Sequence, residues 1–180
     1  MYHHGSQEPI NKIKVTFLGE QMTGKTSCIR NLTGSDFDPT YNRTVGIDFL
    51  KLKPPTRPAL EYMVWDTAGE DRFRSLIPSY IRDSIICILV FDITRRDTLF
   101  SARVDGFVEA MNINAPDSIK LLLGMMADLH DDRAVTHDEG EKYAIDHDMF
   151  YMEYSAKDGL PHVLHCKIFE MFDKIFYFYF

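Results

Sequence analysis

The sequence has 180 residues, 45% of them hydrophobic, and a formal net charge of −7. Its length fits one well-buried domain, since domains commonly contain about 100–200 residues. The acidic balance and the lack of a basic block in the sequence argue against sequence-independent binding to nucleic acid, which depends on clustered lysine and arginine.

Apolar runs alternate with helical patterns along the chain, which is typical of an α/β domain with a mostly parallel sheet. In the first half, a buried strand is predicted at 12–19 and a helix at 24–32. Two alternating segments, 46–53 and 59–66, flank a proline-rich stretch and therefore predict an antiparallel pair joined by a stiff turn. A loop that runs into a short helix is predicted at 71–84.

The second half continues the alternation of strands and helices. A near-continuous apolar strand, of the kind that is covered on both faces, is predicted at 85–94. A helical pattern follows at 98–111. Thr136 predicts the start of another helix, because acidic residues follow this capping-type threonine. The remaining predicted elements are strands at 118–125 and 149–157 and a last helix at 159–176.

The three cysteines, Cys28, Cys87 and Cys166, are far apart and lie in apolar or helical surroundings. That arrangement predicts buried, reduced thiols rather than disulfides or a metal site. His162 and His165 lie on the last predicted helix without a carboxylate partner in register, so no zinc site is expected. No apolar run approaches the roughly 20 residues that a membrane span needs, and we expect a soluble protein.

A glycine-rich stretch, "GEQMTGKTS", lies between the first predicted strand and helix. Gly19, Gly24, Lys25 and Thr26 fit the spacing G-x-x-x-x-G-K-[ST], in the strand-to-helix context that this motif needs. Small residues let successive backbone N–H groups surround phosphates at the positive end of a helix. Lys25 would then reach the β- and γ-phosphates, and the Thr26 hydroxyl would ligate Mg²⁺. The stretch predicts nucleotide binding.

A second motif, "WDTAGE", supplies the other half of such a site. Asp66 comes at the end of an apolar strand, where its carboxylate can hold Mg²⁺ through water. Gly69 can offer its backbone N–H to the γ-phosphate. A strand-end aspartate alone has a common structural explanation, but this tetrad behind a phosphate-binding loop favours the nucleotide site.

The chain resembles the Rab branch of the Ras-like small GTPases and is most similar to the Golgi-associated Rab-six subgroup. The resemblance covers about 12–176, and its most specific stretches are "FLGEQ", "TVGIDFL" (44–50) and "WDTAGEDRFRSLIPSYIRDS" (65–84), with "SAK" (155–157) in support. It implies an α/β fold of the P-loop NTPase type, with a six-stranded, mostly parallel sheet flanked by five helices. It also implies a GTPase domain at 12–176, between a flexible leader, 1–11, and an aromatic end, 177–180.

The resemblance assigns a role in binding the nucleotide to matching positions. Phe37 would pack against the guanine ring, and Tyr41 would cover the nucleotide. The whole implied nucleotide-binding set is Gln21, Met22, Thr23, Gly24, Lys25, Thr26, Ser27, Phe37, Tyr41, Thr44, Gly69, Met125, Met126, Asp128, Ser155, Ala156 and Lys157. The implied Mg²⁺ ligands are Thr26, Thr44 and Asp66, and the implied catalytic residues are Lys25, Thr44 and Glu70.

The resemblance also implies a switch that is read by effectors. Loss of the γ-phosphate would free Thr44 and Gly69, so that both switch segments relax. The implied effector-binding residues are Val45, Gly46, Ile47, Phe49, Trp65 and Tyr80. The last three match an aromatic triad that Rabs present to effectors. Without the resemblance, their pattern would indicate half-buried aromatics of a sheet.

Two departures from the family pattern fall on functional positions. The family reads guanine with N-K-x-D, whereas this chain has Met125, Met126, Ala127 and Asp128. Asp128 can still accept hydrogen bonds from the ring N–H and exocyclic amine of guanine, so guanine preference should survive. Met125 lacks the polar side chain that would bridge base and loop, which predicts affinity lower by about 10- to 100-fold, for a loss of about 1–3 kcal/mol. Met126 would keep the packing of a lysine stem over the base without its charge.

The second departure is Glu70, where the family has the glutamine that orients the attacking water. Glutamate can accept a hydrogen bond from water, but it cannot donate one to the developing phosphoryl charge, and it adds negative charge. Gln21 and Met22 are also larger than the residues at these positions in many Ras-like proteins, and bulk there can crowd the water. Slow or altered hydrolysis is expected.

The sequence therefore favours a Rab-like GTP-binding switch that hydrolyses GTP slowly and recruits effectors in Golgi-type vesicle transport. The alternative is a pseudo-GTPase scaffold that binds nucleotide weakly or statically; an ATPase is disfavoured by Asp128 and the motif order. Expected partners are Mg²⁺, GTP or GDP, effectors, an exchange factor and a GTPase-activating protein, with the protein itself a monomer. It is expected in the cytoplasm, reaching Golgi or vesicle membranes only through a prenylated tail that is not in this sequence.

Overall fold

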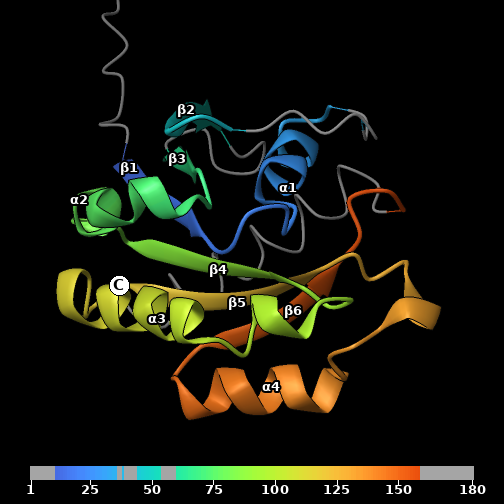
Figure 1. The fold of residues 1–180 in the computed structure, drawn as a ribbon. Coiled ribbons are helices and arrows are strands. Elements are labelled where there is room, and N and C mark those ends of the chain that lie inside the picture. The colour runs from blue at the N-terminus through green and yellow to red at the C-terminus, as the bar shows by residue number, and fades with distance from the viewer. Residues whose placement is uncertain (1–10, 36–37, 39–43, 54–59, 159–180) are drawn as a thin grey trace, which may run out of the picture.

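Six strands form one sheet in the order β2-β3-β1-β4-β5-β6 (Figure 1). The computed structural model describes residues 11–35, 38, 44–53 and 60–158. Neighbouring strands are parallel except for β2, which pairs antiparallel with β3. The strands are β1 Asn11–Leu18, β2 Ile47–Leu52, β3 Leu60–Thr67, β4 Ile86–Asp92, β5 Ile119–Met125 and β6 Phe150–Tyr154. The predicted six-stranded, mostly parallel sheet is confirmed.

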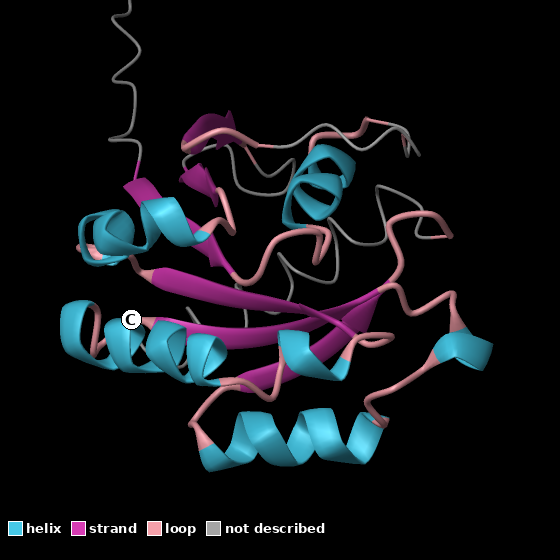
Figure 2. Ribbon diagram, viewed as in Figure 1, coloured by secondary structure: helices cyan, strands magenta, loops and turns pink. Residues whose placement is uncertain are grey.

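Helices cover both faces of the sheet, as Figure 2 shows with helices in cyan and strands in magenta. The α-helices are α1 Lys25–Leu32, α2 Ile77–Ile81, α3 Ala102–Asn114 and α4 His137–Asp146, and the 3-10 helices are η1 Asp71–Leu76, η2 Arg96–Thr98 and η3 His130–Asp132. Apolar side chains of α1 pack in one core cluster, and those of α2, α3 and α4 pack in the other. The fifth helix, expected at 159–176, lies outside the described residues.

Two parts of the core follow directly from the residue types. All seven residues of β4 are buried, as expected for a continuous apolar strand with helices on both faces. Cys28 and Cys87 are buried free thiols, as predicted, and burial raises the pKa of both. Cys166 lies outside the described residues. No helix in the described part of the chain is long and apolar enough to span a membrane.

The helix predicted at 98–111 begins later, at Ala102, because polar contacts hold a separate turn before it. The Thr98 hydroxyl donates to the carbonyl oxygen of Arg95 at 2.6 Å and accepts from the N–H of Asp92 at 3.0 Å. These bonds close η2 against the end of β4. By contrast, the Thr136 cap agrees with its prediction, since Thr136 and Glu139 form a reciprocal capping box.

The loops that follow the adjacent strands β1 and β4 lead to opposite faces of the sheet. β1 lies between β3 and β4, and the chain leaves β1 toward α1 on one face but leaves β4 toward α3 on the other. Crevices at the carboxyl ends of such strands are the usual ligand sites of parallel α/β sheets. Gly19 follows β1 here, with φ +138°, and a Cβ added to it would collide with the carbonyl of Val90 in β4. The two strand ends are therefore in backbone contact.

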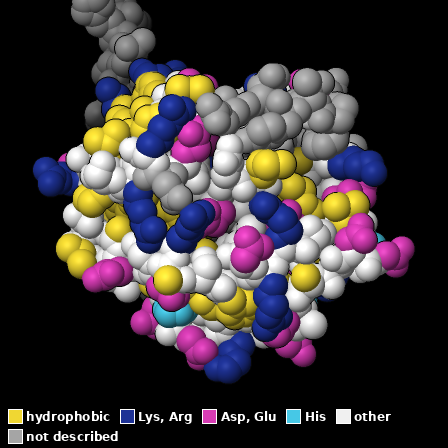
Figure 3. Space-filling model, in the orientation of Figure 1, with side chains coloured by type: hydrophobic (Ala, Val, Ile, Leu, Met, Phe, Trp, Pro, Cys, Tyr) yellow, Lys and Arg dark blue, Asp and Glu magenta, His cyan; other side chains and the backbone are white. Residues whose placement is uncertain are grey.

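The described surface carries both signs of charge. Figure 3 shows lysine and arginine side chains interspersed with aspartate and glutamate on one face of the molecule. The extents proposed for the leader at 1–11, the domain at 12–176 and the end at 177–180 stay predictions, because 1–10 and 159–180 lie outside the described residues.

A buried hydrogen bond joins the last strand to α1, and it provides a test of the packing. The Tyr154 hydroxyl donates to the Asn31 side-chain oxygen, and both residues are buried. Tyr154→Phe leaves that oxygen without its donor, so the free energy of unfolding should fall by about 1–3 kcal/mol in urea denaturation. Tyr80→Phe is the control, because the Tyr80 hydroxyl has no hydrogen bond to the described residues. An equal loss in both variants would contradict this account.

Candidate nucleotide site

The phosphate-binding loop, residues 19–26, connects β1 to α1. α1 begins at Lys25, directly after Gly24, which has φ +91° and is the N-cap. The first N–H groups of a helix have no intrahelical acceptor and lie at its positive end. This arrangement suits an anion such as a phosphate at the start of α1.

Lys25 is buried at the base of this loop, with 6% of its surface exposed. Its Nζ donates to the carbonyl oxygens of Gly19 at 2.9 Å and Glu20 at 2.7 Å. Burial lowers the pKa of Lys25 to about 8, against the opposing influence of Asp66 and Glu20. A bound phosphate would favour the charged ammonium and replace part of the hydration that burial removes.

Three oxygen-bearing side chains from separate segments meet beside Lys25. Thr26 Oγ1 lies 2.8 Å from Thr44 Oγ1 and donates to Asp66 Oδ2 at 2.5 Å, while Thr44 Oγ1 lies 3.5 Å from the same oxygen. Asp66 is 2% exposed, and its Oδ1 has no hydrogen-bond partner among the described residues. Burial raises the pKa of Asp66, and hydrogen bonding from Thr26 opposes that rise.

This donor set fits Mg²⁺, which prefers oxygen ligands and is usually held by one or two protein groups together with phosphates and water. A cation would also satisfy the unpaired Asp66 Oδ1 and favour its carboxylate form. The structure thus brings together the three residues that the sequence assigned to the metal. Thr26 comes from α1, Thr44 from the segment before β2, and Asp66 from the end of β3.

The segment after β3 lies against the phosphate-binding loop. A Cβ added to Gly69 would collide with the backbone of Glu20 and Gln21, so only glycine fits this approach. The next residue, Glu70, is paired with Arg72, whose Nε lies 2.8 Å from Oε2. The Glu70 side chain is only 13% exposed. The negative charge of Glu70, the residue expected to position the attacking water, is therefore partly balanced by a neighbouring arginine.

Met125, which the resemblance aligns with a base-reading asparagine, contacts the phosphate-binding loop. Met125, the last residue of β5, is fully buried and belongs to the same core cluster as α1. A Cβ on Gly24 would lie 3.3 Å from Met125 Cε, so Met125 is in close apolar contact with the loop. Packing replaces the polar bridge expected from the family pattern.

The other base-side residues lie at the ends of β5 and β6. Met126 is half-buried with φ +65° and packs on the same core, and the Asp128 side chain is 12% exposed. Lys157 Nζ is 3.9 Å from Asp128 Oδ2. The loop after β6 is fixed at two points: Ser155 Oγ accepts from the N–H of Asp158 at 3.0 Å, and the Ala156 carbonyl accepts from Asn31 Nδ2 at 3.5 Å.

The residues assigned to effectors, here called the effector edge, lie in or just before β2, in β3 and on α2; Val45 and Phe49 are exposed, and the others are half-buried. Phe49 and Trp65 face each other across the two strands, with ring centroids 5.5 Å apart, and Phe49 is 44% exposed. The ammonium of Lys14 lies 4.6 Å from the Trp65 ring centre. Val45 is exposed ahead of β2, whereas Tyr80, on α2, forms no ring contact with either aromatic among the described residues.

The remaining assigned residues divide into two groups. Gln21, Met22, Thr23 and Ser27 belong to the loop or the first turn of α1, and Gly46 and Ile47 lie at the start of β2. Phe37 and Tyr41 lie outside the described residues.

Sequence reasoning missed Arg72, and it missed Asp92 and Arg95 at the end of β4. For Asp92 and Arg95, the signal that could have found them is their position at the end of a buried strand and in the turn after it; that strand, β4, lies beside β1, which leads into the phosphate-binding loop.

Comparison with known families agrees with this geometry. The family model described as the Ras family matches residues 14–175, which include the phosphate-binding loop, the Asp66 segment and both base-side loops. Members of this family are GTPases that bind guanine nucleotide and Mg²⁺. The chain belongs to the Ras family of small GTPases.

Proposed function

We propose that this protein is a Rab-like molecular switch that binds GDP or GTP with Mg²⁺ and hydrolyses GTP slowly. The observation that carries this proposal is the meeting of Thr26, Thr44 and Asp66 beside the buried Lys25. The Thr26–Thr44 contact connects the phosphate-binding loop to the segment that leads into β2. A phosphate that contacts the loop can therefore change the order of the effector edge, which begins in that segment.

In this mechanism the bound Mg²⁺ would neutralise charge on the phosphates. Thr26 and Thr44 would hold it directly, and Asp66 would do so through water. Lys25 would contribute a buried positive charge, and the Gly69 N–H would add a donor when a γ-phosphate is present. Loss of that phosphate would remove the contacts of Thr44 and Gly69 while leaving Lys25 and Thr26 in place. GTP and GDP would then stabilise different conformations of the same edge.

Guanine binding rests on Asp128, whose mostly buried carboxylate can accept from the base. Met125 cannot make the polar bridge, but its contact with Gly24 keeps the base side packed against the loop. Losing one partner in a buried polar set costs about 1–3 kcal/mol, or about 10- to 100-fold in affinity. A weakened site of this kind still favours guanine, because adenine does not present the two donors that Asp128 would bind.

Hydrolysis is expected to be slow because Glu70 accepts hydrogen bonds without donating any to the phosphoryl charge. The ion pair with Arg72 reduces the repulsion between the Glu70 carboxylate and the phosphates. It also restricts the orientation in which the carboxylate can bind the attacking water. The pair of the exposed Phe49 and the half-buried Trp65 supports effector binding of the Rab type. Golgi-type vesicle transport, regulation by an exchange factor and an activating protein, a monomeric state and membrane attachment through a lipidated tail are further parts of the proposal.

A pseudo-GTPase scaffold is the second candidate, and the apolar Met125 together with the paired Glu70 favours it. In that case nucleotide would bind weakly or statically, and Phe49 and Trp65 would form a constitutive docking edge. The two candidates differ in whether bound GTP is converted to GDP.

Single-turnover hydrolysis with protein in excess over GTP separates the candidates. Glu70→Gln restores a side chain that both accepts and donates, so the rate of phosphate release should rise about tenfold or more. Lys25→Ala is the control without the buried cation and should release no phosphate above buffer. Release by the unaltered protein no faster than by this control would remove the enzyme and leave the scaffold.

The base preference is tested by Asp128→Asn. The amide cannot accept from both guanine donors, but it can donate to the extra carbonyl of xanthine, so the ratio of GDP to XDP affinity should fall about 100-fold or more. Asp131→Asn, an exposed neighbour in η3, is the matched control and should leave the ratio unchanged. Competition against a fluorescent nucleotide measures the ratio. An unaltered preference in Asp128→Asn would show that Asp128 does not read the base.

A further inference from the structure

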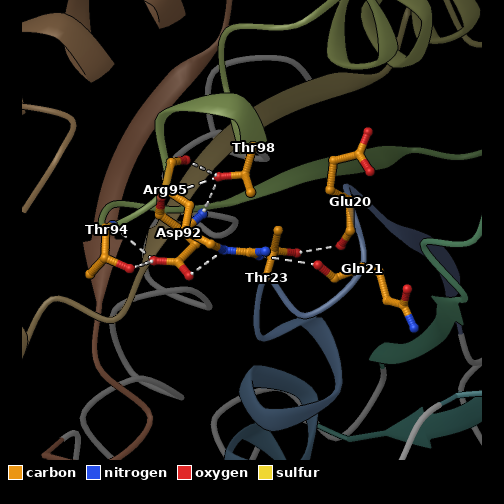
Figure 4. Close-up of polar contacts among 7 residues, drawn as sticks. All are labelled: Glu20, Gln21, Thr23, Asp92, Thr94, Arg95 and Thr98. Carbon is orange, nitrogen blue, oxygen red and sulfur yellow. Dashed lines mark hydrogen bonds and ion pairs between the residues drawn. The ribbon is translucent and has the colours of Figure 1, made fainter.

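An arginine from the turn after β4 contacts the backbone of the phosphate-binding loop. Arg95 Nε donates to Asp92 Oδ2 at 3.0 Å, and its Nη2 donates to the carbonyl oxygen of Gln21 at 3.1 Å. Figure 4 shows the guanidinium between the Asp92 carboxylate and the Gln21 backbone. The contact joins the ends of β4 and β1, the adjacent strands whose following loops lead to opposite faces of the sheet.

The Asp92 end of this contact is rigid. Its carboxylate is 8% exposed, and its Oδ1 accepts from the N–H of Thr94 at 2.8 Å and from the Thr94 hydroxyl at 2.7 Å. Thr98 closes the same turn by donating to the Arg95 carbonyl. All these groups are drawn in Figure 4. Arg95 therefore has a fixed anchor on one side, and its second donor group reaches the loop in a defined direction.

The Gln21 end is next to an unusual backbone conformation. Met22 has φ +62°, a left-handed value that side chains other than glycine seldom adopt, and it is 56% exposed. Its side chain therefore offers little packing to hold that conformation. The carbonyl of Gln21 and the N–H of Met22 belong to one trans peptide, so they point in opposite directions. Fixing the oxygen toward Arg95 fixes the N–H on the other side of the peptide.

The orientation matters because a phosphate is attracted by N–H groups and repelled by carbonyl oxygens. The neighbouring carbonyl, that of Glu20, is already held by the Thr23 hydroxyl at 2.9 Å and by Lys25. Arg95 performs the same task for the next carbonyl along the loop. Burial is the main cause of the lowered pKa of Lys25, and the nearby charge of Arg95 adds to it, so a second cation lies beside the loop.

We propose that Arg95 is a positioning residue: it bridges Asp92 and the Gln21 carbonyl, holds Met22 in its left-handed conformation, and so orders the loop for the phosphates of the nucleotide. The inference deepens the proposed function and rests on it for the identity of the ligand. The ordering of the loop itself does not depend on any ligand and can be measured without one.

The test compares Arg95→Ala with Arg96→Ala. Arg96 is the adjacent arginine, but it donates to Glu139 at 2.7 Å and to the Ala134 carbonyl at 3.3 Å, away from the loop. Two quantities are measured: the dissociation constant for GDP, and the backbone ¹⁵N order parameters of 21–23 in the nucleotide-free protein. Arg95→Lys keeps the charge but has no planar fork to span both partners. Arg95→Gln removes the charge and replaces Arg95→Ala if that variant does not fold.

Arg95→Ala should bind GDP about tenfold more weakly, the effect of losing one charge-assisted hydrogen bond. Its order parameters at 21–23 should fall from about 0.85 to about 0.6 or below. Arg95→Gln should show the same losses, Arg95→Lys should recover little, and Arg96→Ala should match the unaltered protein.

Unchanged order parameters and GDP affinity in Arg95→Ala would overturn the inference. Full recovery by Arg95→Lys would also overturn it, because charge alone would then explain the effect. If the unaltered protein does not bind GDP, the proposed function fails, whereas the order parameters still decide whether Arg95 orders the loop.

Discussion

The turn from β1 into α1 is the constraint on which the candidate site depends. It carries the first helical residue, Lys25, into the interior, where burial opposes its charge and the carbonyls of its own loop bind the ammonium. The turn is possible only because Gly19 passes the backbone of β4 where no side chain fits, and Gly69 passes the loop equally closely. The ends of β1, β3 and β4 are thereby in backbone contact around one loop.

Two residues beside this loop depart from the family pattern while the backbone of the loop keeps its form. Met125 fills the base side with packing where a polar bridge is expected, and Glu70, paired with Arg72, places a carboxylate where a glutamine is expected. In the proposed function, the first would weaken the recognition of guanine, and the second would weaken stabilisation of the phosphoryl charge. The oxygen cluster of Thr26, Thr44 and Asp66 is unaffected by either, so binding of phosphate and Mg²⁺ is the part of the function that the frame supports best.

Much of the fold could be predicted from the sequence, because its strands are apolar runs and its phosphate-binding loop is a contiguous motif. The start of α3 was predicted wrongly, since Thr98 bonds to Asp92 and Arg95 instead of continuing a helix. The contact of Arg95 with Gln21 joins residues 74 positions apart, and no periodicity reports such a pair. The pairing of Glu70 with Arg72 depends on the local shape of η1. Roles at Phe37 and Tyr41 stay predictions.

The nucleotide content of the purified protein tests most directly whether the altered site still works. The protein is denatured, and the released nucleotide is separated by ion exchange and quantified against protein. We expect close to one guanine nucleotide per chain, with GTP present beside GDP because Glu70 is proposed to slow hydrolysis. An empty protein that also fails to bind added GDP with Mg²⁺ would show that Lys25 and the oxygen cluster do not form a nucleotide site.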